Sequence, residues 1–491
     1  MKNQKIASVI FFLSAGFALQ AQNLTITKGG QAPAEMIKNT TPVTFTLNGD
    51  HYFIAKYYDK SIMNYHLQSF DSKGGFIAKT NMEVNPGTFN NTNSIDNLAV
   101  FTNKAYALVE HLEKATGKNT LFARSFDNTG KIADAEVELM SIPFEKIMNS
   151  GYNYSDVSAD AKTLAVVAEM PFVKEQPAQF KIALYTEDLK KVKDAEITLP
   201  GENTKNKSMS VAVGNDGTVY IIKKGMTKKG DITLAVYQWT GGTDVKEYTI
   251  DLTAPSQILN YAYEVNDNNE IIVSGMYYER KTLTVGETQA AGVFFLSNKG
   301  KSEKIFQTFK LDAPVDNLTA RKILVNGNTI FLAAEQFKEE RITPPASASG
   351  SMNWDYNYDY THKNEFVIAM NADGTKKFQL ELAKDFKVRD FDKQFYSAYY
   401  IVNGKLTVVY NDQTKKYTKE SGYYQYAIPV LVQITNDGLM QSPVVFKDAL
   451  KLDQEFALYP VFSTQDSNSQ LSFLMENSQH ARFIGVTVAD K

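Results

Sequence analysis

Four aromatic side chains alternate with acids and amides in one short stretch of the sequence. They are Trp354, Tyr356, Tyr358 and Tyr360, and they belong to an insertion, Glu339 to Glu365, that is also rich in Pro, Ser and Ala. Rigid amphipathic rings of this kind stack on the faces of sugars or anchor a protein partner. The spacing therefore predicts a binding surface to which these four residues contribute.

Further tyrosines fall in other insertions, at places that we expect to be equivalent in the fold. They are Tyr277, Tyr278, Tyr417, Tyr423 and Tyr424. Long loops held by a rigid scaffold are where binding residues concentrate, so Tyr277, Tyr278, Tyr423 and Tyr424 join the candidate binding residues. Two alternatives stay open, because tyrosines often serve packing alone: the rings could form a lid over a central opening, or the insertions could be mobile.

Residue types that support other kinds of chemistry are absent or scattered. The chain has no cysteine, which excludes disulfides, thiol nucleophiles and thiolate metal sites. Its five histidines form no pair with metal-ligand spacing, and its Asn/Asp-rich turns lack the terminal glutamate of a calcium loop. We therefore expect no metal and no other cofactor. Only six of the 52 basic residues are arginine, which disfavours a multi-arginine anion site.

Catalytic sequence motifs are also missing. The chain has no phosphate-binding glycine loop, no G-x-S-x-G elbow and no S-x-D-x-G-x-T-W box of the sialidase type. It has only two tryptophans, too few for the docking motifs of quinoprotein dehydrogenases. These absences favour a binding module over an enzyme. Catalysis by acids and a tyrosine brought together from separate parts of the chain remains an alternative.

The insertions interrupt a unit that recurs along the chain. Its clearest copy is FVIAMNADG, Phe366 to Gly374, an apolar run that stops at an Asp-Gly turn. Each unit divides into four strand-like pieces. Second pieces such as LAVV at Leu164 to Val167 are apolar at every position, which is typical of strands buried on both faces. Fourth pieces such as FQLEL at Phe378 to Leu382 alternate apolar and polar residues, which is typical of a half-exposed edge strand.

Turn residues separate these pieces and show that each unit contains four of them. Asn-Gly and Asp-Gly turns recur between the first and second pieces and between the third and fourth, as tight hairpins demand. Units of four strands at a spacing of roughly fifty to seventy-five residues fall in the range of four-strand blades. The chain thus resembles β-propellers in general over residues 22–491, and the hairpin after the third strand looks like the blades of quinoprotein-like propellers.

We therefore predict an all-β fold: a single β-propeller domain of about eight four-stranded blades, with seven blades as the alternative. In such a fold the loops between second and third strands and the crossings between blades share one face, here called the long-loop face. The insertion Glu339 to Glu365 lies on this face. The tight Asn/Gly hairpins lie on the opposite face, here called the tight-turn face.

The end of the repeat predicts how the ring closes. The eighth unit ends after its third piece, RFIGVTV at Arg482 to Val488, and lacks a fourth. The segment NLTIT, Asn23 to Thr27, precedes the first unit and has no partner. We predict that it pairs with the last unit and removes its open edge. The alternative is a frayed N-terminal tail.

Residues 1–21 have the pattern of a secretory signal peptide. Lys2 and Lys5 precede the apolar stretch Ile6 to Leu19, and Ala21 is the expected last residue before cleavage. No later segment approaches the length of a transmembrane helix. Cleavage would take the formal net charge from -3 to -5, a mild value that does not favour nucleic acid as a partner.

These observations combine into one expected function. We expect an exported, soluble bacterial protein, in the periplasm rather than outside the cell, that binds or scaffolds in the cell envelope through its long-loop face. The expected partner is an envelope protein or a glycan. The alternative is a glycan-acting hydrolase or lyase, which requires carboxylates that converge with an arginine or tyrosine at one end of the central channel.

Overall fold

The computed structural model describes residues 24–33, 41–59, 62–85, 87–88, 91–200, 203, 207–226, 232–280, 289–342, 357–389, 395–413, 427–446, 456–477 and 479–489. All structural statements below concern these ranges. Residues 1–21, expected to be a signal peptide, lie outside them. No helical segment within the described ranges has the length and hydropathy that a membrane span requires.

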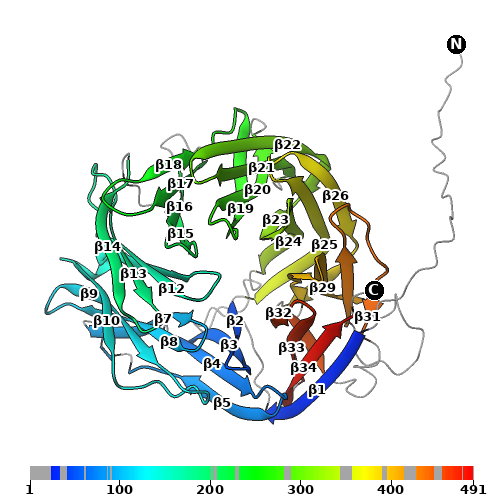
Figure 1. Ribbon diagram of the computed structural model, residues 1–491, viewed down its shortest axis with the longest axis horizontal. Helices are drawn as coiled ribbons and strands as arrows, with labels where there is room; N and C mark the ends of the chain where they lie inside the picture. The colour runs from blue at the N-terminus through cyan, green and yellow to red at the C-terminus, as the bar shows by residue number, and fades with distance from the viewer. Residues whose placement is uncertain are drawn as a thin grey trace, which may run out of the picture.

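Eight antiparallel sheets, or blades, stand side by side in a ring (Figure 1). The first strand of each blade lies at the central opening and the last at the rim. The strands, in blade order and from the inside outward, are β2 (Thr41–Leu47), β3 (Asp50–Asp59), β4 (Ile62–Phe70) and β5 (Phe76–Met82); β7 (Asn91–Val100), β8 (Ala105–Glu113), β9 (Lys118–Ser125) and β10 (Val137–Pro143); β11 (Tyr152–Val157), β12 (Thr163–Glu169), β13 (Gln179–Thr186) and β14 (Lys191–Thr198); β15 (Lys207–Val213), β16 (Val219–Met226), β17 (Ile232–Trp239) and β18 (Lys246–Thr249); β19 (Ser256–Val265), β20 (Ile271–Glu279), β21 (Gln289–Lys299) and β22 (Glu303–Asp316); β23 (Leu318–Asn326), β24 (Thr329–Ile342), β25 (Asn357–Asn371) and β26 (Lys376–Leu382); β28 (Ala398–Val402), β29 (Lys405–Gln413), β30 (Ala427–Ile434) and β31 (Val444–Val445); β32 (Ala457–Ser467), β33 (Gln470–Glu476), β34 (His480–Val488) and β1 (Leu24–Pro33).

Three short elements complete the fold. The strand β6 (Gly87–Thr88) pairs with β7, and β27 (Phe386–Arg389) pairs with part of β25. A single-turn 3-10 helix, η1 (Ile147–Asn149), lies in the crossing from the second blade to the third. The chain is an eight-bladed β-propeller, as predicted, and the alternative of seven blades is wrong.

The hydrophobic core lies between the blades. In β12, Ala165 and Val167 pack in one cluster with residues of the fourth blade, whereas Leu164 and Val166 pack in another with residues of the second blade. Side chains on the two faces of a strand thus cover two different neighbours. Because a fully buried Val or Leu contributes about 1.5–3 kcal/mol, a blade that lost its neighbour would lose much of its stability.

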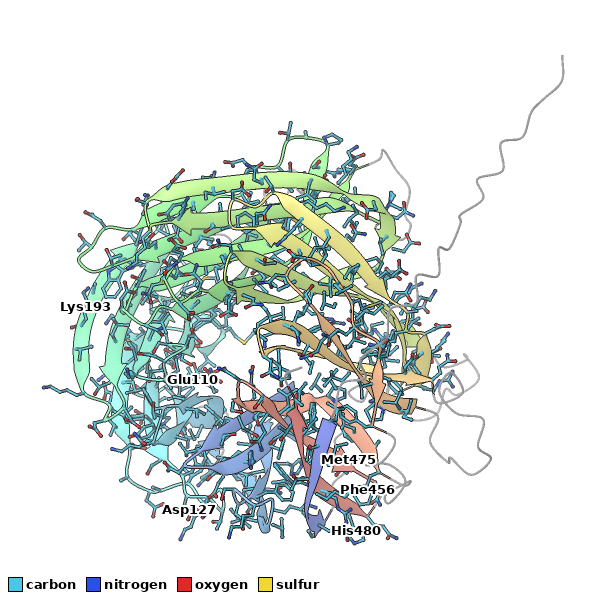
Figure 2. The ribbon with its side chains drawn as sticks, turned by 45° about the vertical axis from the view of Figure 1, so that its right-hand side comes forward. Glu110, Asp127, Lys193, Phe456, Met475 and His480 are labelled. Atoms are coloured by element: carbon cyan, nitrogen blue, oxygen red, sulfur yellow. The ribbon has the colours of Figure 1, made fainter. Side chains whose placement is uncertain are left out.

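The outer strands meet water, as their alternating sequences predict. In β14 only Ile197 is buried and Ala195 half-buried, while the other six side chains are exposed. Figure 2 shows Lys193 of β14 on the outer rim of the ring. Its ammonium group lies 5.2 Å from the centre of the Trp239 ring in the next blade, a cation–π contact between neighbouring blades.

Hairpins on the tight-turn face do more than reverse the chain, because most of them also bond to the next blade. Backbone and side-chain hydrogen bonds link the hairpins after the first strands at seven of the eight junctions in the described ranges. They join Asn48 to Asn103, Thr102 to Ala161, Asp160 to Asn215, Asp216 to Asn269, Asn326 to Gly404, Asn403 to Asn468, and Thr46 to Asp466. The Asn and Asp side chains that favour tight turns therefore also bind adjacent blades together.

The first strand completes the last blade. The antiparallel register of β1 on β34 places Leu24 opposite Val488 and Ile26 opposite Val486, which confirms the predicted closure. The alternative of a frayed tail is therefore wrong for Leu24–Pro33. Figure 2 shows Phe456, Met475 and His480 on this blade, beside β1.

Glycines allow the closing strand to reach the first blade. The Gly30 N–H donates to the Gly74 carbonyl oxygen at 2.6 Å. At Gly74, where φ is 78°, a Cβ would lie 2.6 Å from the Phe483 ring and 2.7 Å from the Gly29 Cα. Only glycine permits both this backbone angle and this close approach.

We predict that Gly74→Ala destabilises the protein more than Gly242→Ala. Both substitutions place a methyl group at a positive φ, which costs about 1–2 kcal/mol. Only position 74 adds a steric clash, since Gly242 has nothing within 4 Å of the added Cβ; overpacking adds about 1–3 kcal/mol. Urea denaturation of both variants measures the difference, and equal losses would contradict a tightly packed closure.

Candidate functional site

The described parts of the insertion on the long-loop face, residues 339–342 and 357–365, belong to two paired strands. We expected Glu339 to Glu365 to be a loop, but β24 continues to Ile342 and β25 begins at Asn357, with Glu339 opposite Tyr360 and Arg341 opposite Tyr358. The strand β27 adds a third member beside β25. The alternation that we interpreted as a row of binding residues in a loop is also a strand pattern, which explains the error.

An aromatic row runs along one face of these paired strands. Tyr358 and Tyr360 lie 6.1 Å apart, and Tyr360 lies 6.3 Å from Phe337, with interplanar angles of 26° and 20°. The row ends at Tyr396, whose ring centre is 5.4 Å from that of Phe337. Phe337, Tyr358 and Tyr396 are half-buried, whereas Tyr360 is only 8% exposed. The half-buried rings keep part of their surface available to a ligand.

Arg321 lies between two rings of this row. Its guanidinium carbon is 4.8 Å from the centre of Phe337 and 4.7 Å from that of Tyr396. Its Nε and Nη2 donate to Glu335 Oε2 at 3.0 and 2.7 Å. The cation–π contacts and the ion pair together fix the guanidinium beneath the row.

A buried charge network supports the row from below. Glu335 Oε1 accepts hydrogen bonds at 2.7 Å from Lys384 Nζ and, in the tautomer protonated there, from His362 Nδ1. Lys384 Nζ also donates to Glu365 Oε1 at 2.7 Å. Glu365 further accepts from the hydroxyls of Ser397 and Tyr399, each at 2.5 Å. The network joins the sixth blade to the seventh at the crossing between them.

The charges of this network balance within the protein interior. Arg321 and Lys384 offset Glu335 and Glu365, and both glutamates and Lys384 are at most 1% exposed. Burial opposes ionisation of Glu335, but Lys384, His362 and Arg321 outweigh it and hold its pKa below the ordinary range. Burial likewise opposes the charge on Lys384, yet the two glutamates raise its pKa. Glu335, Glu365 and Lys384 are closed off from solvent, so we interpret the network as support for the row.

The glutamate of this network belongs to a repeated position. Glu110, Glu169, Glu335 and Glu476 each occupy the sixth place of a second strand, counted from its first core residue. Glu110 accepts from Asn153 of the third blade at 3.0 Å, and Glu169 accepts from Asn203 in the crossing to the fourth blade at 3.4 Å. An alignment of the eight second strands would have shown that glutamate recurs at this place. The sequence analysis did not make this alignment.

The other predicted binding residues divide into two groups. Tyr277 and Tyr278 lie on β20, not in a loop; Tyr277 is 6% exposed, and Tyr278 is half-buried. A Cβ at Gly292 would lie 2.3 Å from the Tyr277 hydroxyl oxygen, so Tyr277 packs within its blade. Trp354, Tyr356, Tyr417, Tyr423 and Tyr424 lie outside the described residues.

A second candidate site lies in the central channel, toward the tight-turn face. A hollow of about 180 Å³ is bounded by the ends of β11, β15 and β19, and its ionisable lining residues are Asp156, Tyr263 and Glu264. Asp156 Oδ2 accepts from the Val213 N–H at 2.9 Å. Burial raises the pKa of Asp156 to about 6. Burial also raises the pKa of Glu264 to about 7; Lys322 opposes this shift, whereas Asp156 adds to it.

A lysine and hydroxyl groups complete the channel lining near this hollow. Lys322 remains accessible to solvent, yet the surrounding ring removes enough water to lower its pKa, and Glu264 opposes that shift. Tyr263 bonds to Ser210, and Tyr261 bonds to Ser210 and Ser208. Two carboxyl groups that titrate near neutrality, beside a tyrosine, can act as a general acid and a general base.

A larger hollow, of about 580 Å³, lies between the fourth and fifth blades. Its two acids are already engaged: Glu247 accepts from the Tyr237 hydroxyl at 3.3 Å, and Asp251 accepts from Thr249 and Lys304. The channel therefore offers the better-placed reactive groups despite its smaller volume. No set of three or more His, Asp or Glu side chains in the described ranges is arranged to hold a metal ion.

Comparisons with known proteins assign the chain to no family. No family model and no curated protein matches the sequence. Among solved structures, the polysaccharide lyase Uly1 is similar over 94% of this chain and 92% of its own, with 10% identity and a TM-score of 0.43. The WD40 domain of SCAP from fission yeast covers 96% and 98% of the two chains, with 9% identity and a TM-score of 0.38.

A third similar structure is an ulvan lyase of polysaccharide lyase family PL25. It is similar over 85% of this chain and 94% of its own, with 9% identity and a TM-score of 0.38. At these identities and scores, the similarities carry no argument about substrate or partner.

The raised pKa values of the channel acids predict how stability depends on pH. The unfolded chain loses these two protons near the ordinary pKa values of 3.8 and 4.5, whereas the folded protein retains them until about pH 6 and 7. The folded state thus binds more protons in this window, so the free energy of unfolding falls as pH rises through it. We expect a fall of roughly 1–3 kcal/mol.

The double variant Asp156→Asn, Glu264→Gln tests this prediction, since neither amide titrates. Chemical denaturation between pH 5 and pH 8 should give a flatter profile for the variant than for the native protein. Parallel profiles would mean that the two carboxyl groups are not desolvated.

Proposed function

We propose that the protein is exported to the periplasm and binds glycan chains of the cell envelope through its long-loop face. The single observation that carries this proposal is the aromatic row Tyr358, Tyr360, Phe337 and Tyr396, held on the buried charge network. Export rests on the signal-peptide pattern of residues 1–21.

The geometry of the row suits a sugar polymer. Three of its rings lie nearly parallel, with interplanar angles of 20° and 26°, and the half-buried Tyr358 and Phe337 offer a sugar chain two similarly oriented apolar surfaces. Sugars present C–H groups on their faces and hydroxyls at their edges, a division that amphipathic rings match. The charge network removes conformational freedom from the row before a ligand arrives, which lowers the entropic cost of binding.

Substitution at Tyr358 tests the proposal. Tyr358→Ala should weaken binding to a preferred glycan about tenfold, since one stacked ring contributes on the order of 1–1.5 kcal/mol. Binding is measured by affinity electrophoresis against a panel of envelope polysaccharides and then by calorimetry. Phe76→Ala is the matched control, because Phe76 is a 38% exposed ring on the outer strand of the first blade.

Two outcomes would contradict glycan binding at this row. One is equal affinity of both variants and the native protein, which would place the site elsewhere. The other is no binding to any polysaccharide together with Tyr358-dependent binding of an envelope protein.

A second function, cleavage of a glycan, is favoured by the acid pair in the channel. Glu264 has the higher pKa and retains its proton near neutral pH, so it suits the general acid. Asp156 is ionised at lower pH and suits the general base, which activates water for hydrolysis or removes a sugar proton for elimination. Tyr263 lies in the same hollow and can orient the substrate.

Incubation of the same polysaccharides with the protein tests cleavage. New reducing ends, or new unsaturated ends that absorb ultraviolet light, should appear. The rate should rise with pH near pH 6 and fall again near pH 7. Glu264→Gln should lower this rate about 10²–10⁴-fold. Asp437→Asn is the control, because the Asp437 side chain is 92% exposed in a turn of the seventh blade, far from the channel. Equal rates for both variants would exclude the pair from the chemistry.

A further inference from the structure

Arg321 uses only part of its hydrogen-bonding capacity inside the protein. A guanidinium carries five N–H donors, and Arg321 gives one from Nε and one from Nη2 to Glu335 Oε2, at 3.0 and 2.7 Å. Its third nitrogen, Nη1, donates to no residue that the structure describes, and it is not buried. The Arg321 side chain as a whole is 23% exposed. Two N–H donors of Nη1 are therefore available to a ligand.

The guanidinium is fixed at one end of the aromatic row. Its carbon lies 4.8 Å from the centre of the Phe337 ring and 4.7 Å from that of Tyr396. The carboxylate that pairs with it is held in turn by Lys384 and His362. A donor fixed in this way loses little entropy when it binds. Because it contacts both rings, it lies next to the edge of any sugar that stacks on either of them.

The accessible part of the charge network is its positive end. Glu335 and Glu365, which balance Arg321 and Lys384, are both closed off from solvent, whereas Nη1 of Arg321 is not. An anionic group that approaches the row thus meets the guanidinium before it meets either glutamate.

The other charged side chains beside the row do not favour either sign. Glu339 stands opposite Tyr360 and Arg341 stands opposite Tyr358, and both charged side chains are exposed. One acid and one base along the same pair of strands offset each other. Any preference for charge in a bound sugar therefore depends on Arg321.

The chemistry of this donor favours a carboxylate over a hydroxyl. The planar guanidinium matches the geometry of a carboxylate, and hydrogen bonds between two charged groups are roughly twice as strong as those between neutral groups. A uronic acid carries its carboxylate at the edge of the sugar ring, so the ring can stack while the carboxylate reaches Nη1.

We propose that Arg321 makes the aromatic row selective for glycans that contain uronic acids, because its Nη1 donates to the carboxylate of a stacked sugar. This inference rests on the proposed glycan binding and adds the class of sugar to it. The rings supply affinity for any sugar face, and Arg321 distinguishes an acidic sugar from a neutral one.

Chemical change of the ligand tests the inference on the native protein. Calorimetry compares polygalacturonate and alginate with the same polymers after methyl esterification, which removes the charge of each carboxylate and keeps the sugar rings and hydroxyls. The native protein should bind at least one acidic polymer about tenfold more tightly than its ester, as one charge-assisted hydrogen bond predicts.

The possible failures of this comparison have different meanings. Equal affinity for acid and ester, or Tyr358-dependent binding of neutral polysaccharides alone, would overturn the selectivity and leave glycan binding by the row intact. Binding of no glycan at all would overturn the proposed function and the selectivity with it. The comparison needs no variant, so it does not depend on how a substitution affects folding.

A variant then assigns the selectivity to Arg321. Arg321→Gln should bring the ratio of the two affinities close to one, because the loss falls on the acidic polymer. A merely structural role would weaken both polymers and leave their ratio unchanged, which would overturn the inference. Arg124→Gln is the matched control: Arg124 makes the same type of pair, from Nε and Nη2 to Glu136 Oε2, on β9 of the second blade, and its substitution should preserve the ratio.

Discussion

Each blade of this protein has two apolar faces, and each face is covered only by a neighbouring blade. In β12, alternate side chains belong to different hydrophobic clusters, one shared with the blade before and one with the blade after. An open row of such sheets would leave one apolar face uncovered at each of its two ends. The ring, the closing strand β1 and the hydrogen bonds between adjacent hairpins all follow from this requirement.

Buried glutamates form a second constraint, on the long-loop side of the ring. A carboxylate without water is costly unless it is paired, and three of the four repeated glutamates meet a partner in the crossing or first strand that follows. Asn153 meets Glu110, Asn203 meets Glu169, and Lys384 meets Glu335. In the sixth blade the glutamate also binds Arg321, whose guanidinium contacts two rings of the aromatic row. The network therefore fixes the position of the row.

The architecture could be predicted from local sequence, and the sites only in part. Apolar second strands such as Leu164 to Val167 and repeated Asn-Gly turns determine blade number, because each reflects burial or backbone geometry at its own position. The pairing of β1 with β34 could be predicted too, since the last unit lacked a strand. Tyr358 and Tyr360 were found by residue type, but their place on a strand was not foreseen.

The channel acids could not be found in this way. Asp156 and Glu264 lie 108 positions apart in sequence, and each resembles an ordinary polar residue near the end of an inner strand. Their raised pKa values arise from loss of water inside the ring, where the ends of β11, β15 and β19 come together. A single sequence shows which residues carry charge, but the dielectric environment of that charge is a property of the assembled ring.

The register of the closing strand has a mechanical consequence. Leu24 faces Val488, so the two free ends of the described fold lie at the same end of one antiparallel pair. Force that pulls these ends apart loads the hydrogen bonds of this pair one after another instead of all together. Tension applied at these two ends therefore opens the ring first at the pair of β1 and β34 that closes it.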